Sequence, residues 1–481
     1  MRHTKRFLIG VRWPAEHRGQ IGAGGGSMDA IMNVINVYIG FMWGWPLIII
    51  ITAAAVLFSI VLKFFQFRKF GYIARNTFGK MFSKEVRGEG TLTPFQAAAS
   101  ALAGTLGVGN IAGVGVAVAV GGAGALFWMW VVAVLAAVAK YAEVVLGMHY
   151  REKDPETGEF RGGFMYIVTK GFKGNWKWLA LIWSFLFFLQ FLISGAVQSN
   201  AIADTVAHSF GADKMIVGII VAVFVGLVIL GGIKRIGKVA EKLVPLMAVI
   251  YFLGAMAIII LNIGQLPAAF GLIISSAFTG MAPVGGFAGS TVLIAIRNGF
   301  ARGVYSNEAG MGTSPVAHAT ATVDHPVRQG LWGVIEVFVD TIIMCTMTGL
   351  VIVITGAIET GEVGASLTAT AFRSGLPGRG DLIVTISTIF FAYTTILVAE
   401  YYSEIGGVYC FGKKIIMPYR LVFLVGIVVG AVGGLHTVWG LLDAFMATTV
   451  AINLVVIMMM YKTVVRLTDE YFNTVIKNDK K

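Results

Sequence analysis

Two glycine-rich runs inside long apolar segments carry residue types that suit the binding of ions and carboxylates. The first spans residues 104–113 (GTLGVGNIAG) and the second spans residues 278–287 (FTGMAPVGGF). Each Gly costs about 1 kcal/mol in a helix interior relative to Ala, and Pro removes a backbone donor, so we expect both helices to unwind there. Unwound backbone offers carbonyl oxygens to a small cation, and the adjoining helix N-termini offer N–H groups to a carboxylate. A zwitterionic amino acid and Na⁺ would suit such a site.

Glycine also allows close helix packing, which is the alternative interpretation of these runs. Gly109 and Gly113 have the spacing of small residues at a helix–helix contact. Packing alone does not require two interruptions of this kind. Irregular backbone at membrane depth persists only where it is buried in protein or lines a polar cavity. The pair of runs therefore favours two helix breaks that line a site.

The composition indicates the solvent around these helices. The chain has 481 residues, of which 57% are hydrophobic and only 13% are charged. A soluble domain is about half apolar and a quarter charged, so a cytosolic enzyme, a disordered regulator and a nucleic-acid module are all disfavoured. The two cysteines, Cys345 and Cys410, lie in apolar stretches and indicate buried thiols rather than a disulfide framework or a metal set.

Eleven apolar runs have the length of a membrane-spanning helix, which needs about 20 apolar residues. We expect these spans at 34–62, 94–121, 124–148, 177–208, 215–231, 239–263, 273–300, 328–356, 382–410, 416–434 and 438–461.

The cations between these runs predict the orientation of the chain. Lys and Arg gather in one set of loops, which comprises 63–93, 149–176, 232–238, 301–327, 411–415 and the tail 462–481, whereas the other loops carry only Lys214, Arg373 and Arg379. Cytoplasmic loops of membrane proteins are enriched in cations, so we expect the first set and the C-terminus in the cytoplasm. The net charge of +12 then reflects loops of a cell-membrane protein rather than binding to nucleic acid.

The segment 1–27 does not fit this orientation, because it places five cations on the predicted outer side. It also lacks an apolar core long enough for a signal peptide. We interpret 1–27 as a disordered or non-native extension and Met28 as the natural start. N-terminal sequencing of the native protein tests this hypothesis. Residues 28–93 would then form one extra transmembrane helix and a basic cytoplasmic loop.

The remaining ten runs divide into two halves. The two interrupted runs are the first and the sixth of the ten, so each opens a group of five helices, 94–263 and 273–461. Because five is odd, the halves must cross the membrane in opposite directions. Interrupted helices at matching positions of inverted halves point to the binding site of a secondary transporter. The sequence thus predicts an all-α multi-pass membrane protein with a 5+5 inverted repeat after one extra helix.

Long motifs of this chain resemble those of the alanine or glycine:cation symporter family. The resemblance covers nearly all of 29–465 and includes residues 93–96 (TPFQ), 121–130 (GGAGALFWMW), 140–143 (KYAE), 306–319 (SNEAGMGTSPVAHA) and 325–330 (HPVRQG). It implies a LeuT-type fold, sodium as the coupling ion, and uptake of a small neutral amino acid by alternating access. It implies no enzymatic activity.

The resemblance also implies roles for individual residues. Thr105, Gly107 and Asn110 would lie at the shared substrate and cation site, and Gln198 and Asn200 would hydrogen-bond the substrate. An interhelical amide contact is the alternative for these two side chains. The carbonyls of Ala103 and Leu106 would form the backbone half of a second cation site, and Thr394 and Thr395 its side-chain half, since hard cations prefer oxygen ligands. Back-bonding to the preceding turn is the alternative for the two threonines. Phe278 and Thr279, at the second run, would cover the substrate.

Charged residues inside the spans are further candidates. An intramembrane carboxylate is a functional hypothesis by default, so Asp340 could complete a cation site, although a structural bond to the first break would also explain it. Lys140 and Glu143 lie nearer a helix end and could simply snorkel or pair. We interpret His318 and His325 as loop or gate residues rather than metal ligands.

One departure from the family concerns the substrate. A tryptophan usually follows the threonine pair, but this chain has Ala399 one turn after Thr395, followed by Glu400. The lost indole would leave room for a substrate larger than alanine, such as glutamine, or for a cationic one. Glu400 or Asp340 could alternatively carry a proton, which would make the protein a proton-coupled symporter. A channel-like pore is less favoured, because no ring of like charge or filter loop is present. The sequence predicts no oligomeric state.

Overall fold

The computed structural model describes residues 26–81, 88–283, 285–376, 378–433 and 436–476. Of the predicted extension 1–27, residues 1–25 lie outside the described residues. Within the described part the chain is helical, except for a short antiparallel hairpin of β1 (Glu152–Lys153) and β2 (Phe160–Arg161).

The helices that position the candidate site form the centre of the bundle. In chain order they are α5 (Pro94–Thr105), η3 (Val108–Asn110), α6 (Ala112–Gly121), α7 (Gly124–His149), α9 (Lys177–Phe210), α11 (Gly232–Leu261), α13 (Val292–Asn307), α14 (Ser314–His318), α15 (Pro326–Val337), η5 (Phe338–Cys345), α16 (Thr346–Ile354), α18 (Asp381–Phe411) and α20 (His436–Met459).

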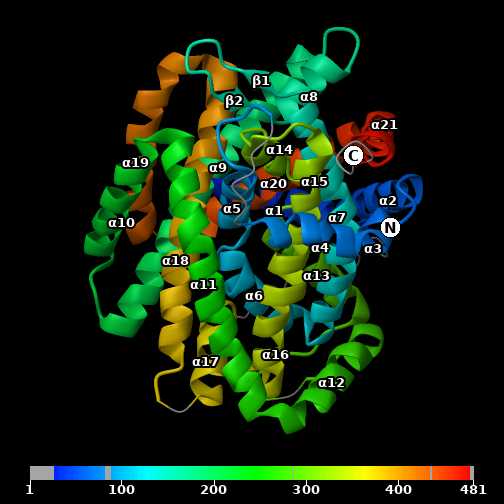
Figure 1. Ribbon diagram of the computed structural model, residues 1–481. Helices are drawn as coiled ribbons and strands as arrows, with labels where there is room; N and C mark the ends of the chain where they lie inside the picture. The colour runs from blue at the N-terminus through cyan, green and yellow to red at the C-terminus, as the bar shows by residue number, and fades with distance from the viewer. Residues whose placement is uncertain (1–25, 82–87, 284, 377, 434–435, 477–481) are drawn as a thin grey trace, which may run out of the picture.

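Further helices surround this centre. They are α1 (Gly26–Met42), α2 (Trp45–Val61), α3 (Phe65–Arg68), α4 (Phe70–Asn76), η2 (Phe78–Lys80), α8 (Phe164–Gly171), α10 (Lys214–Ile229), η4 (Ile263–Gln265), α12 (Leu266–Thr279), η6 (Ala357–Thr360), α17 (Ala365–Gly375), η7 (Lys413–Ile415), α19 (Ile416–Val432), α21 (Tyr461–Glu470) and η8 (Tyr471–Val475). Figure 1 shows α10 and α19 along one flank, α2 and α21 on the other, and α12 and α17 at the end opposite the β-hairpin.

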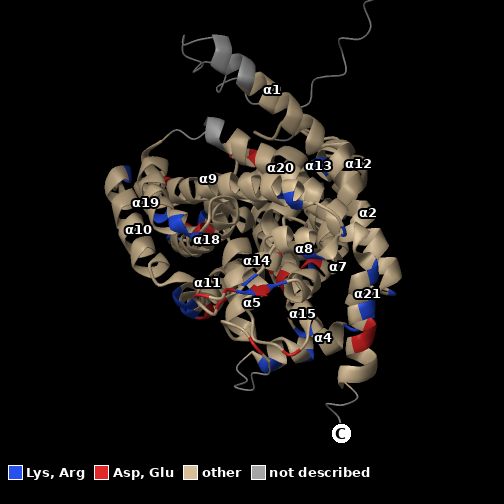
Figure 2. Cartoon of the chain, turned by 90° about the horizontal axis from the view of Figure 1, so that it is seen from above, with Lys and Arg blue, Asp and Glu red and all other residues tan. Residues whose placement is uncertain are grey.

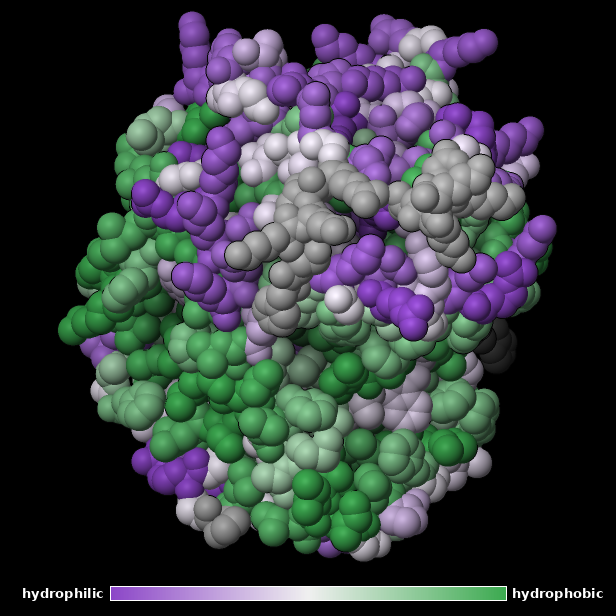
Figure 3. Space-filling model, viewed as in Figure 1, coloured by the Kyte–Doolittle hydropathy of each residue, from purple (hydrophilic) through white to green (hydrophobic). Residues whose placement is uncertain are grey.

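The surface is divided into an apolar belt and a polar cap. The belt is green in Figure 3, whereas the purple cap covers the end that carries β1, β2 and α8. Large apolar side chains such as Leu227, Leu253 and Val425 are each about 60% exposed, at 58%, 60% and 62%. Exposing so many large apolar side chains to water is energetically unfavourable, so this belt is the surface that contacts lipid.

Most of the predicted spans are found as helices. Among the described residues, eight helices are long and apolar enough to cross a membrane, and the bent pair Pro94–Thr105 and Val108–Gly121 makes nine. The predicted span 215–231 is the shorter apolar helix α10. These helices confirm a multi-pass architecture; the finer arrangement of eleven spans in two inverted halves stays a prediction.

The predicted span 273–300 is wrong. The chain leaves helix α12 at Thr279 and resumes helix only at Val292, in α13. Between them Met281 and Ser290 form an isolated antiparallel bridge, so the segment is a turned loop at the end of the bundle. Gly280 and Gly289, at φ +76° and +87°, supply the left-handed backbone that this loop needs.

The predicted cytoplasmic loop 301–327 is largely wrong as well. Its first part completes α13, and its middle part contains α14, where Ser314 and His318 are at most 1% exposed. The segment is therefore part of the core. The predicted outer loop 357–381 likewise contains a helix, α17, which packs against α18 and α6.

Candidate functional site

The first predicted break is present. Thr93 caps α5, because its side chain accepts from the Gln96 N–H while the Gln96 side chain accepts from the Thr93 N–H. Helix α5 ends at Thr105, and the chain bends by 55° before it continues through η3 and α6. Residues 104–110 are all buried. The unwound backbone therefore lies in the protein interior, where its polar groups need internal partners.

Asn110 supplies some of these partners. Its Oδ1 accepts from Gly107 N at 3.0 Å, and its Nδ2 donates to Asp340 Oδ1 at 2.6 Å and to Ser306 Oγ at 3.1 Å. Asp340 is fully buried and also accepts from Thr341 Oγ1. The sequence analysis placed Asn110 at the ligand and offered Asp340 either as a cation ligand or as a structural bond to the first break. The structure brings the two together but satisfies them with each other, so they hold the first break against α13 and η5 and do not line the cavity described below.

The second break lies between α13 and α14, at residues 308–313, and not at 278–287. Its backbone is held by α7, since Glu143 accepts from Gly310 N at 2.8 Å and from Gly312 N at 3.0 Å. Asn453 of α20 donates to Glu143 and to Gly310 O. Both glycines have φ near +80°, at +86° and +78°. The sequence analysis expected Glu143 to snorkel or to pair near a helix end. In the structure it is fully buried and clamps the broken helix.

Several buried charged residues cluster around this break. Lys140 donates to Asn307 O and pairs with Glu336 at 3.3 Å, and His318 Nε2 lies 2.7 Å from Glu336. Figure 2 shows acidic and basic residues where α5, α7, α14 and α15 meet, and another group between α18 and α19. Burying a charged side chain is energetically unfavourable unless it is paired, so the ion pairs in both groups stabilise these charges in the folded interior.

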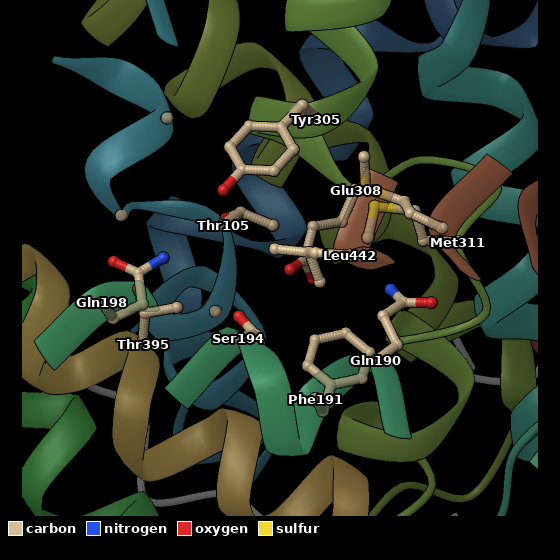
Figure 4. A pocket seen from close by; sticks show the side chains of 14 residues that line it. Thr105, Gln190, Phe191, Ser194, Gln198, Tyr305, Glu308, Met311, Thr395 and Leu442 are labelled. Carbon is tan, nitrogen blue, oxygen red and sulfur yellow. The ribbon is translucent and has the colours of Figure 1, made fainter. Parts of the chain in front are cut away.

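A cavity of about 30 Å³ opens between the two breaks. It is lined by the first break, the second break, and α9, α18 and α20 (Figure 4). The lining residues are Gly104, Thr105, Gly107, Gly109, Gln190, Phe191, Ser194, Gln198, Tyr305, Glu308, Met311, Thr395, Leu442 and Met446. This volume holds one or two water molecules, so a larger ligand requires the lining side chains to move apart.

Thr395 and Ala103 form a pair of oxygens beside this cavity. Thr395 Oγ1 lies 3.0 Å from Ala103 O and also donates to Phe391 O. Its neighbour Thr394 faces away, toward Met247 of α11, and bonds Phe391 O. Only one of the two predicted threonines therefore meets the first break. Leu106 is buried but does not line the cavity.

Gln198 reaches the cavity from α9, as predicted from the sequence. Figure 4 shows it near Thr395, on one side of the cavity. A Cβ placed on Gly107 would lie 2.7 Å from Thr395 Oγ1 and 3.6 Å from Gln198 Nε2, so only glycine lets both side chains approach the backbone here. Asn200 instead donates to Gly430 O and Gly433 O, which ties α9 to the end of α19.

Three other predicted substrate contacts lie away from the cavity. Phe278 is 58% exposed and packs edge-on against Phe127 and Trp128, and Thr279 is exposed and donates to Ser275 O. Both belong to the surface helix α12, because the second break is elsewhere. Ala399 is buried but is not a lining residue, since the cavity ends at Thr395.

The carboxylate of Glu400, which the sequence offered as a substrate or proton site, points to α19. Arg420 donates to Glu400 at 3.3 Å and to Glu404 at 2.9 Å. One guanidinium is thus shared by two buried carboxylates at a helix–helix contact, away from the cavity lining.

Sequence reasoning missed more than half of the residues that line the cavity, among them Gln190, Phe191 and Ser194 of α9. Tyr305, Glu308 and Met311 come from the true second break, and Leu442 and Met446 come from α20. Glu308 and the two glycines after it carried a usable signal, because an acidic residue beside Gly-x-Gly in an apolar context is unusual for a loop. Leu442 and Met446 are ordinary apolar residues, four apart on a helix, and carried none.

Comparison with known proteins identifies the family of this chain. The model of the sodium:alanine symporter family matches residues 28–481. The chain belongs to this family. Its relatives include the sodium/alanine symporter AgcS of Methanococcus maripaludis, 40% identical over 461 residues, which are 94% of this chain and 100% of the relative. The transporter YflA of Bacillus subtilis is 42% identical over 451 residues, 93% of this chain and 95% of the relative.

A relative with another printed substrate is the probable sodium/glutamine symporter GlnT of Bacillus subtilis, 34% identical over 442 residues, 91% of this chain and 90% of the relative. Among solved structures, a manganese transporter of Eremococcus coleocola aligns with a TM-score of 0.48 at 14% identity, over 78% of this chain and 80% of that one. This likeness is too low to support an argument. The family itself supports amino-acid:cation symport by a multi-pass membrane protein.

Proposed function

We propose that this protein is a sodium-coupled symporter that carries a small neutral amino acid into the cell. The observation that carries the proposal is the cavity between two helix breaks, with carbonyl and hydroxyl oxygens at its edge, in a chain of the sodium:alanine symporter family. Two of the relatives named above are called a sodium/alanine symporter and a probable sodium/glutamine symporter, which fits both parts of the proposal.

Sodium would bind at the pair formed by Ala103 O and Thr395 Oγ1. Both atoms are uncharged oxygens, 3.0 Å apart, which suits a hard monovalent cation. The two residues belong to different helices, α5 and α18, so an ion between them would fix the distance between these helices. Binding of the ion and of the amino acid would then strengthen each other, since linkage between two sites is reciprocal.

The amino acid would bind in the cavity and contact both breaks. Its carboxylate suits the side where η3 begins, because the N-terminal end of a helix carries partial positive charge and Gln198 can donate there. The cavity is too small for an amino acid as it stands, so the breaks must separate on binding. Substrate binding and rocking of the two halves would thereby be coupled, which is the basis of alternating access.

The proposed arrangement is the 5+5 inverted repeat after one extra helix. The first half would comprise α5–α6, α7, α9, α10 and α11, and the second α13–α14, α15–α16, α18, α19 and α20. Each half then opens with a broken helix, which is what inverted-repeat transporters require. The α1–α2 segment would be the extra span. The polar cap in Figure 3 would face the cytoplasm of a cell membrane, with the C-terminus on that side.

Uptake by proteoliposomes tests the proposal. With an imposed inward sodium gradient, the protein is expected to accumulate labelled alanine, glycine or glutamine above the outside concentration. Uptake that follows an imposed proton gradient and ignores sodium would contradict sodium coupling. Equilibration without accumulation would indicate a channel-like pore.

A matched pair of variants tests the sodium site. Thr395→Val removes the hydroxyl that faces Ala103 O and is expected to raise the half-saturating sodium concentration about 10-fold, which is the effect of losing one good ligand bond. Thr394→Val makes the same chemical change on the adjacent residue, whose side chain faces α11, and is expected to change it less than 2-fold. Equal effects of the two variants would refute the assignment.

A further inference from the structure

Glu308 differs from every other side chain that lines the cavity. Among the fourteen lining residues in the described part of the chain it is the only one with a charge. It is 6% exposed, and it sits at the end of α13 with φ +54°, in the left-handed region that non-glycine residues seldom adopt. That backbone conformation costs about 1 kcal/mol or more, so surrounding contacts must hold it. The conformation directs the carboxylate into the cavity (Figure 4).

The carboxylate has an unused acceptor. Glu308 Oε2 is buried and has no hydrogen-bond partner among the described residues, and the same holds for the hydroxyl of Tyr402. Both atoms approach Gly104, since a Cβ on that glycine would lie 3.5 Å from Glu308 Oε2 and 3.4 Å from the Tyr402 hydroxyl. A buried carboxylate without a partner is costly, so these oxygens are expected to receive a donor from a ligand.

The neighbouring cation does not fill this role. Lys140 donates to Asn307 O at 2.8 Å and pairs with Glu336 at 3.3 Å. Its charge is thereby committed to Glu336. The cavity side of Glu308 is left facing Gly104 and Met311, with no basic side chain among the lining residues.

The cavity is polarised from one side to the other. Gln198 and Thr395 stand on one side, and Glu308 stands apart from them (Figure 4). Helices α5 and α13 both end beside Glu308, so their carbonyl ends add partial negative charge to the carboxylate. The amide group of Gln198 can donate a hydrogen bond on the opposite side. A zwitterion has the same polarity, with an ammonium group and a carboxylate one carbon apart.

We infer that Glu308 is the ammonium subsite of the cavity and that it selects substrates that carry a free α-amino group. The inference rests on the proposed amino-acid transport. The ammonium group would donate to Glu308 and to the last carbonyls of α5, with Tyr402 as a further acceptor. The same carboxylate repels a second negative charge, so amino acids with an acidic side chain are excluded. 2-Hydroxy acids with a neutral side chain, such as lactate, bind poorly because a hydroxyl brings no positive charge to the buried carboxylate.

The test compares one amino acid with its hydroxyl analogue. Binding of alanine and of lactate is measured in detergent by competition against the neutral amino acid that the wild type binds best, at fixed saturating sodium. Glu308→Gln keeps the shape of the side chain and removes its charge. We expect it to weaken alanine binding about 10- to 100-fold, the effect of one charge-assisted hydrogen bond, and not to weaken lactate binding, because lactate is an anion that the carboxylate repels. Glu362→Gln, at an exposed residue, is the control and is expected to change neither.

Each outcome decides the inference. An unchanged ratio of alanine to lactate affinity in Glu308→Gln overturns it. A shift in the half-saturating sodium concentration with an unchanged ratio also overturns it and makes Glu308 a sodium ligand. If the Gln variant is not recovered as a monodisperse protein, Glu308→Asp replaces it, because shortening the side chain withdraws the carboxylate and should lower the same ratio. A wild type that binds amino acids but does not accumulate them refutes the transport proposal alone, whereas a wild type that binds none refutes both.

Discussion

The clamp that Glu143 places on the second break can be removed by one substitution, Glu143→Ala. In the wild type the fully buried carboxylate accepts from the N–H groups of Gly310 and Gly312, at 2.8 and 3.0 Å. The neighbouring residues of the break are glycines with positive φ and form no regular helix, so no intrahelical carbonyl can replace these bonds. The variant leaves two buried donors without an acceptor.

The loss of stability in Glu143→Ala follows from the number of buried N–H groups that lose their acceptor. Each buried N–H without a partner costs about 1–3 kcal/mol, and the truncation adds a small cavity. We therefore expect Glu143→Ala to lower the free energy of unfolding by about 3–5 kcal/mol. Glu143→Gln keeps one carbonyl acceptor and should lose about half as much. The loosened break also forms one wall of the cavity, so amino-acid binding should weaken together with stability.

Unfolding in mixed micelles, titrated with sodium dodecyl sulfate, measures the first quantity, and competition binding measures the second. Glu362→Ala removes an exposed carboxylate of similar size and should change the free energy of unfolding by less than about 0.5 kcal/mol. If the free energy of unfolding of Glu143→Ala lies within about 0.5 kcal/mol of the wild-type value, the clamp does not stabilise the protein. If it is destabilised but binds amino acids normally, the break does not shape the site.

Three further predictions concern other parts of the molecule. Burial raises the pKa of Asp154, but hydrogen bonds from Lys413 and backbone N–H groups, with the charge of Arg161, outweigh it and lower the pKa to about 2. This carboxylate should therefore stabilise the protein above its unfolded pKa near 4 and cease to do so as the pH falls toward 2. The free energy of unfolding of the wild type should drop more over that pH interval than the free energy of unfolding of Asp154→Asn. Glu400→Gln should leave the preference between neutral and basic substrates unchanged in competition assays, because Glu400 pairs with Arg420 outside the cavity; a change of more than about 3-fold would contradict this placement. Gly312→Ala should lower the free energy of unfolding by at least about 2 kcal/mol, because φ is +78° and the added Cβ would overlap the ring of Trp183. An unfolding titration that matches the wild type would show that alanine is not strained at this position.

The helices and the first break could be predicted from the sequence, because both depend on local signals. Long apolar runs must cross the bilayer as helices, since the backbone has no other way to satisfy its polar groups there. The run at 104–110 ends a helix with a capping box at Thr93 and contains three glycines, so its break follows from propensity. Thr395 and Gln198 line the cavity, while Thr394 does not, because adjacent helical residues point about 100° apart. Their roles toward sodium and substrate stay predictions.

The second break was misplaced for a physical reason. Residues 280–289 contain four glycines and a proline, which is a stronger break signal than Glu308–Thr313. That signal is real, but it marks a turned loop at the bundle end, where Met281 pairs with Ser290. Glycine content reports that a helix cannot continue. It does not report whether the irregular backbone is then satisfied by water or by protein.

What separates the two cases is the partner of the freed backbone. A loop at the surface can use water, so it needs no polar residue elsewhere in the chain. A break in the interior needs acceptors and donors from other helices, and both breaks have them: Asn110 and Asp340 serve the first, and Glu143 serves the second. Glu143 was visible in the sequence as a carboxylate within an apolar helix, and such a residue must have a buried partner or be neutral. Matching each intramembrane carboxylate to a glycine-rich segment would therefore have left 278–287 without a partner and would have favoured 308–313, the segment that carries Glu308 into the cavity.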